Sequence, residues 1–140
     1  MRFWDASAIV PLLVEEPRTP DARAALDEDT GIVTWWGTRI ECTSAVARLE
    51  REGTLTSKQA MQALDVLRML ADGWNEILPA EVVRETACRL LRVHALRAAD
   101  ALQLAAATVM AGGRPSEAGF LAFDDRLRDA AAREGFRVGP

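Results

Sequence analysis

Short apolar segments alternate along the chain with longer segments in which apolar residues recur every three or four positions. A short apolar run bounded by turn residues is typical of a buried strand, and the longer spacing is typical of an amphipathic helix. The pattern therefore predicts strands at residues 2–4, 31–35, 76–79, 119–124 and 136–138. It predicts helices over residues 7–16, 20–29, 38–53, 56–73, 80–94, 96–110 and 125–135, with a surface loop at 111–117.

This order of strands and helices predicts an α/β fold. Strands that are separated by helices are joined by right-handed crossovers, so they form a parallel sheet with helices on both faces. We expect a three-layer α/β/α sandwich around a central, mostly parallel sheet of four to five strands. A chain of 140 residues without a repeat or linker is expected to form one domain over residues 1–140.

The predicted helix over residues 96–110 is apolar on every side, and from Ala98 to Met110 its only charge is Asp100. A helix of this kind is expected in the interior, where an ionised carboxylate is costly unless something pairs with it. The backbone N–H groups of the first helical turn are one such partner. A cation is the other, so Asp100 raises the question of what lies beside it.

Three further acidic residues are placed by the pattern near Asp100. Ligands bind a parallel sheet at the carboxyl ends of its strands. Asp5 and Asp124 end predicted strands there, and Glu41 lies near the start of the helix that follows the second strand. Each acid alone is explained as a helix cap or a strand end, but together they predict a carboxylate cluster. Such a cluster stays ionised only with cations, and its hard oxygen ligands suit Mg²⁺ or Mn²⁺.

Composition limits the other kinds of chemistry. The 17 basic and 21 acidic residues give a net charge of −4, so nucleic acid would need local arginines or metal ions. His94 is the only histidine, which excludes histidine-based catalysis, and it is expected to be a surface residue that ends a helix. Cys42 and Cys88 form no metal-binding or disulfide pattern and are expected to be small buried residues.

Other features fit a cytoplasmic protein that does not contact membranes. The N-terminus lacks the order of a signal peptide, and no apolar run approaches the thickness of a bilayer. We expect Trp35 and Trp36 to pack in the core rather than to stack on bases, and Trp4 and Trp74 to be structural. The apolar stripe along residues 60–70 is either core or a dimer face.

Four segments, in this order, resemble the PIN-domain ribonucleases and, within them, the VapC toxins of bacterial toxin–antitoxin pairs. They are RFWDASAIVPLLVEE, RIECTSAVARLEREG, LRAADALQLAAA and GFLAFDDRLRDAAAREGF. The resemblance implies that Asp5, Glu41, Asp100 and Asp124 bind metal, and that Ser7 is a supporting hydroxyl unless it caps its helix. It also implies a Mg²⁺- or Mn²⁺-dependent endoribonuclease that hydrolyses RNA phosphodiester bonds by attack of activated water.

The resemblance further implies partners: an RNA substrate such as tRNA or rRNA, a VapB-like antitoxin, and a second copy in a homodimer. The alternative function is a catalytically silent PIN-like module that only engages an antitoxin-type partner. Many relatives have Ser or Thr where this chain has Ala122, and Asp125 competes with Asp124 for the fourth position. We expect Asp125 to cap the last helix instead. Arg97 either reaches phosphate or is a solvated residue at a helix start.

Overall fold

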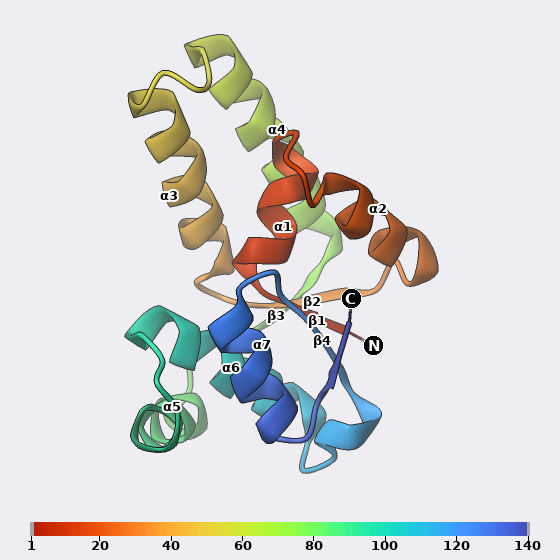
Figure 1. Ribbon diagram of the computed structural model, residues 1–140, viewed down its shortest axis with the longest axis vertical. Helices are drawn as coiled ribbons and strands as arrows, with labels where there is room; N and C mark the ends of the chain where they lie inside the picture. The colour runs from red at the N-terminus through yellow and green to blue at the C-terminus, as the bar shows by residue number, and fades with distance from the viewer. Residues whose placement is uncertain (1, 140) are drawn as a thin grey trace.

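A five-stranded parallel sheet lies at the centre of the computed structural model, which describes residues 2–139 (Figure 1). The strand order is β3-β2-β1-β4-β5, and every neighbouring pair is parallel. The strands are β1 (Arg2–Trp4), β2 (Ile32–Trp35), β3 (Asn75–Ile77), β4 (Gly119–Leu121) and β5 (Arg137–Val138). The predicted α/β fold with a parallel sheet is therefore confirmed.

Helices cover both faces of this sheet, so the three predicted layers are present. Figure 1 shows α1 to α4 on one side of the strands and α5 to α7 on the other, with α3 and α4 forming a hairpin that extends away from the sheet. Within residues 2–139 the helices are α1 (Ala6–Leu13), α2 (Thr19–Glu28), α3 (Thr38–Arg51), α4 (Ser57–Gly73), α5 (Glu81–Val93), α6 (Ala98–Ala111), the short 3₁₀ helix η1 (Pro115–Glu117) and α7 (Asp125–Arg133).

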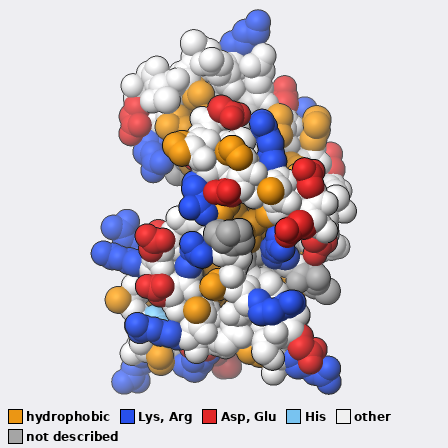
Figure 2. Space-filling model, turned by 45° about the vertical axis from the view of Figure 1, so that its right-hand side comes forward, with side chains coloured by type: hydrophobic (Ala, Val, Ile, Leu, Met, Phe, Trp, Pro, Cys, Tyr) orange, Lys and Arg blue, Asp and Glu red, His pale blue; other side chains and the backbone are white. Residues whose placement is uncertain are grey.

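Charged side chains occupy the outer faces of these helices. On the face shown in Figure 2, acidic and basic side chains are interspersed over both halves of the molecule, and no broad basic field covers it. This distribution agrees with the net charge of −4, and it means that any attraction for a polyanion has to be local.

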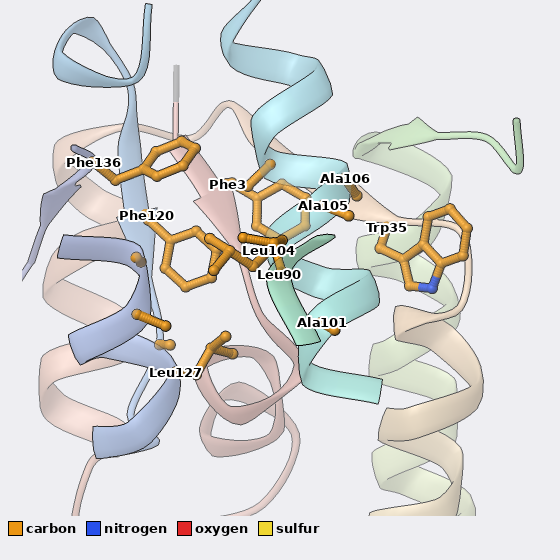
Figure 3. Close-up of a cluster of buried hydrophobic side chains, with 14 of the residues drawn as sticks. Phe3, Trp35, Leu90, Ala101, Leu104, Ala105, Ala106, Phe120, Leu127 and Phe136 are labelled. Carbon is orange, nitrogen blue, oxygen red and sulfur yellow. The ribbon is translucent and has the colours of Figure 1, made fainter. Parts of the chain in front are cut away.

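Two apolar cores lie on opposite faces of the sheet because successive strand residues point to opposite sides. Phe3 and Phe120 face α5, α6 and α7, and their rings stack with centroids 5.5 Å apart (Figure 3). Trp4 and Leu121, the next residue on each strand, face α1 and α4. The side chains of α6 are small over Ala105–Ala107 and fully buried, which lets this helix lie close against the strands.

Several expectations for single residues are wrong. Cys88 is exposed, because the buried face of α5 consists of Val83, Ala87 and Leu90. Trp36 is 48% exposed, since β2 ends at Trp35 and Trp36 lies in the turn that follows it. His94 follows α5 as expected, but its ring is largely buried beside Glu134, with Nε2 2.7 Å from the Glu134 Oε1.

Other expectations hold. Trp4, Trp35 and Trp74 are buried in the cores, and so is Cys42, whose thiol pKa is raised mainly by burial. The stripe on α4 divides into two faces. Ala60, Ala63 and Leu67 are core, whereas Met61 and Met69 are exposed. None of the helices within residues 2–139 combines the length and the apolar character that crossing a membrane would need.

Candidate active site

The carboxyl ends of β1 and β4 form the centre of the candidate site. From β1 the chain goes to β2 on one side and later to β4 on the other, which makes the gap between β1 and β4 the switch point where open parallel sheets bind ligands. Trp4 and Leu121 are aligned across the two strands, and the N–H of Asp5 donates to the Leu121 carbonyl at 2.9 Å. The residues that follow these strands are therefore brought to one place.

Asp5 is the most deeply placed of the predicted acids. It is 5% exposed and is the N-cap of α1, where its carboxylate accepts the Ser7 backbone N–H at 2.9 Å. Burial raises the pKa of Asp5 to about 6, against the lowering effect of the hydrogen bonds from Ser7. The negative charge of Asp100 raises it further. Capping alone does not offset the cost of an ionised Asp5 at neutral pH.

Glu41 approaches the same place from the first turn of α3. Its carboxylate is half-buried and accepts a hydrogen bond from the Nε2 amide of Gln103 on α6. Burial raises the pKa of Glu41 to about 7, although the Gln103 hydrogen bond lowers it. The negative charges of the neighbouring Asp5 and Asp100 carboxylates also raise the pKa of Glu41.

Asp100 is in the first turn of α6, as predicted from the apolar helix around it. The backbone N–H of Arg97 donates to its carboxylate, so the helix N-terminus is one of its partners. The pKa of Asp100 is nevertheless raised, first by burial and then by the charge of Asp124. Both explanations offered by the sequence, the cap and the cluster, apply to this residue.

Asp124 is the N-cap of α7, and the expectation that Asp125 fills this position is wrong. The carboxylate of Asp124 accepts the Leu127 backbone N–H at 2.9 Å, and the helix begins at Asp125. The reason is that β4 ends at Leu121 rather than at residue 124, which leaves Ala122 and Phe123 as a short connection. Asp124 is also the acid of this pair that lines the pocket described next.

All four predicted acids line one pocket of about 450 Å³. Ser7, Arg18 and Arg48 line it as well. Among residues 2–139, no three His, Cys, Asp or Glu side chains converge tightly enough to enclose an ion. The carboxylates instead surround an open space, which suits a cation that keeps several of its water ligands, as Mg²⁺ does.

The supporting residues are placed as follows. The hydroxyl of Ser7 accepts the Phe123 backbone N–H at 2.9 Å, so it connects α1 to the segment just before Asp124 and does not cap α1. Ala122 is buried in the apolar core. Arg97 is the N-cap of α6 and is exposed, outside the pocket lining, and its reach to phosphate stays a prediction.

Gln103 and Thr38 were not singled out from the sequence, yet they belong to this site. Both are fully buried, and they contact each other through two hydrogen bonds of 3.1 and 3.2 Å. The available signal was that Gln103 is a polar residue on an apolar helix, one turn after Asp100. Arg18 was also missed. Its guanidinium lies 4.2 Å from the centre of the Phe123 ring and pairs through Nε with Asp21.

Comparison with known proteins places this fold and pocket in a family. The PIN domain matches residues 2–133, which is nearly the whole chain. The chain belongs to the PIN-domain family and, within it, to the VapC ribonucleases. Its relatives include Ribonuclease VapC45 of Mycobacterium tuberculosis strain CDC 1551 / Oshkosh and Ribonuclease VapC49 of strain ATCC 25618 / H37Rv. Each is 34% identical over 141 residues, covering 99% of this chain and 94% of the relative.

Solved structures agree on the fold. A toxin–antitoxin complex from Klebsiella pneumoniae contains a chain that superimposes with a TM-score of 0.68 at 17% identity. FitAcB from Neisseria gonorrhoeae superimposes with a TM-score of 0.68 at 19% identity. Each comparison covers 100% of this chain and 97% of the other. The resemblance drawn from the four sequence segments is thereby confirmed.

The raised pKa values of Asp5 and Glu41 predict that the metal-free protein becomes less stable as the pH rises from 5 to 8. The folded chain holds these two protons more tightly than the unfolded chain does, so stability is present below the unfolded pKa values and is lost as the pH rises through about 6 and 7. The expected loss in free energy of unfolding is on the order of 2 kcal/mol. Urea unfolding at pH 5, 6, 7 and 8 with a chelator measures it.

The control for this pH dependence is the double variant Asp5→Asn, Glu41→Gln, in which the two titrating groups are replaced by neutral isosteres. Its stability is expected to change much less between pH 5 and pH 8. A wild-type protein whose stability rises over this interval would contradict the assignment.

The two functions of Asp124, cap and pocket charge, are separable by substitution. Asn also accepts a hydrogen bond as an N-cap, so Asp124→Asn is expected to keep the stability of α7 while removing the charge. Asp124→Ala removes both and is expected to cost roughly 0.5–2 kcal/mol. Asp125→Ala is the matched control and is expected to change stability by less than about 0.5 kcal/mol. Thermal and urea unfolding compare the three, and a larger loss in Asp125→Ala than in Asp124→Ala would reverse the assignment.

Proposed function

We propose that this protein is the toxin component of a type II toxin–antitoxin system and acts as a metal-dependent endoribonuclease. One observation supports this most directly: the four predicted acids, at the starts of four different helices, line one pocket at the carboxyl edge of the sheet, together with Glu16. Burial and mutual repulsion raise the pKa values of three of them, so they need positive charge to be ionised together. The VapC ribonuclease relatives name the reaction class that such a site performs.

The donor set fits Mg²⁺ or Mn²⁺. All four side chains offer hard oxygen ligands, and neither histidine nor cysteine lines the pocket. Asp5, Glu41, Asp100 and Asp124 are the residues that would hold the ion. A divalent cation, when bound, neutralises this cluster, activates water for attack on phosphorus and stabilises the leaving oxygen.

The chain's own residues supply orientation and proton handling. His94 lies outside the pocket, so the proton of the attacking water would be handled by a carboxylate or by the metal itself. Glu41 is our candidate for orienting this water, because it lines the pocket and Gln103 holds one of its carboxylate oxygens. Asp5, capped by the Ser7 N–H, provides a fixed negative group at the deepest point of the pocket.

Two arginines in the pocket lining give the RNA backbone a place to bind. Arg18 and Arg48 lie at the rim of the same pocket as the acids. The guanidinium group pairs with phosphate through two parallel hydrogen bonds, and such contacts position a nucleic acid without reading its sequence. The substrate we propose is RNA, with structured RNA such as tRNA or rRNA as the class.

The partners that follow from this proposal are a VapB-like antitoxin and a second copy of the chain. A groove of about 390 Å³ lies between the end of α1 and the α3–α4 hairpin, and the apolar face of an amphipathic antitoxin helix fits its apolar part. The groove is lined by the apolar residues Leu13, Val14, Leu55, Ala63 and Val66 and by the polar residues Glu15, Thr54, Gln59 and Gln62. The Klebsiella pneumoniae neighbour is itself part of a toxin–antitoxin complex. We place the toxin in the cytoplasm, where its RNA substrates are.

The variants Asp5→Asn and Asp100→Asn are expected to lose metal-dependent RNA cleavage by at least about 100-fold. Both should keep or slightly raise the metal-free stability at pH 8, because each substitution removes one charge from a repelling group. Cleavage of a structured RNA with Mg²⁺ or Mn²⁺, and thermal unfolding with a chelator, measure the two effects. Full activity in either variant removes that residue from the site. No cleavage by the wild type with either ion would favour the silent binding module.

Arg48→Ala is expected to raise the KM for RNA several-fold and to make binding less dependent on salt. Each phosphate contact that is removed lowers the slope of log affinity against log salt concentration by about one. Metal affinity should stay the same or increase, since a cation is removed from the rim. Arg68→Ala, at an exposed position on α4, is the matched control and should leave KM unchanged. Equal effects of the two substitutions would show that general charge, and not this contact, is responsible.

A further inference from the structure

The four acids of the pocket are held in two different ways. Each aspartate is short and accepts a backbone N–H at the start of its own helix: Asp5 from Ser7, Asp124 from Leu127, and Asp100 from Arg97. Folding of the local helix therefore orients these three carboxylates. Glu41 is longer and has more rotatable bonds, and its carboxylate is held by the side chain of Gln103, 62 residues away along the chain.

The side chain of Gln103 is held in place by residues other than Glu41. Its side chain is fully buried on α6, and Thr38, also fully buried, contacts both ends of its amide. The Thr38 hydroxyl donates to Oε1 at 3.2 Å and accepts from Nε2 at 3.1 Å. The Nε2 end of the amide faces Glu41 because a carboxylate accepts hydrogen bonds and only the Nε2 end donates them.

The position of these residues explains why they are polar. Thr38 is the first residue of α3, and Glu41 follows one turn later on the same helix. Gln103 follows Asp100 by one turn on α6. The Thr38–Gln103–Glu41 contact thus connects the two helices that carry Glu41 and Asp100. An aliphatic residue at 103 would pack in the same space without donating to either partner.

We propose that Gln103, held by Thr38, is the positioning residue that keeps the Glu41 carboxylate in the metal pocket. This inference rests on the proposed function, since it assigns Gln103 a role toward the ion that the acids would hold. A buried hydrogen-bond partner that orients a metal ligand contributes to affinity without touching the ion. Gln103 reduces the number of orientations that Glu41 has to give up when the ion binds, which is pre-organisation.

The test is a double-mutant cycle in which Mn²⁺ alone is the probe. Wild type, Gln103→Met, Glu41→Gln and the double variant are titrated with Mn²⁺, and the free ion is measured by electron paramagnetic resonance. Gln103→Met should weaken binding by roughly 10- to 100-fold. In the Glu41→Gln background the same substitution should change affinity by less than about twofold, because its effect passes through Glu41.

Two outcomes of this titration overturn the inference. Wild-type affinity in Gln103→Met shows that Gln103 does not position a ligand. An equal loss with and without Glu41 shows that Gln103 acts only on the fold. If the wild type does not bind Mn²⁺, the proposed function itself is contradicted. If the wild type binds Mn²⁺ and Gln103→Met binds it equally well, only this inference is contradicted.

Two further measurements extend the test. The first uses Thr38 variants and does not require Gln103→Met to fold, and the second uses the metal-free protein. Thr38→Val removes the hydroxyl at nearly constant shape and should weaken Mn²⁺ binding, whereas Thr38→Ser should lose less. Thr108→Val, which removes a hydroxyl bonded only to the Leu104 carbonyl of α6, is the matched control and should bind Mn²⁺ as the wild type does. In the metal-free wild type, the Gln103 side-chain amide protons should exchange slowly and shift in Glu41→Gln. Unshifted resonances would overturn the inference.

Discussion

The alignment of β1 with β4 in the middle of the sheet is the constraint on which the site depends. Trp4 and Leu121 face each other across these strands, and both chains then leave the sheet at the same edge. Asp5 follows β1 directly and caps α1, and Asp124 follows β4 after two connecting residues and caps α7. A shift of this pairing by one residue would place Phe3 and Phe120 on opposite faces of the sheet and would separate the two acids. Packing and chemistry therefore select the same register.

The acids of the pocket combine a structural and a chemical function. Asp5 and Asp124 are N-caps, and Asp100 accepts a backbone N–H in the first turn of α6, so each stabilises a helix start. The same placement buries these carboxylates and brings their charges together, and both effects, burial first, raise the pKa values of Asp5 and Asp100. Helix starts are used because they hold a short carboxylate rigidly and with partial positive charge nearby. The remaining repulsion is what a cation would relieve.

Helix α6 contributes more to the site than its charge suggests. Its small buried residues allow it to lie against the sheet, and it carries both Asp100 and Gln103 toward α3. The hydrogen bonds from Gln103 to Thr38 and Glu41 make α3 and α6 one unit at the pocket. A polar network of this kind is stabilising only when each of its members is satisfied, which agrees with the full burial of Thr38 and Gln103.

The sequence by itself determined the order of the elements, the parallel sheet and the edge at which the four acids lie. These follow from local periodicity and from the rule that parallel strands end at one edge, so they need no knowledge of distant contacts. Only the tertiary structure decided that Asp124 rather than Asp125 caps α7, because the end of β4 depends on its pairing with β1. It also decided that Trp36 is exposed, that His94 lies beside Glu134, and that Gln103 holds Glu41. Periodicity shows which face of an element is buried, but the partner of a buried polar group comes from another part of the chain and is set by packing.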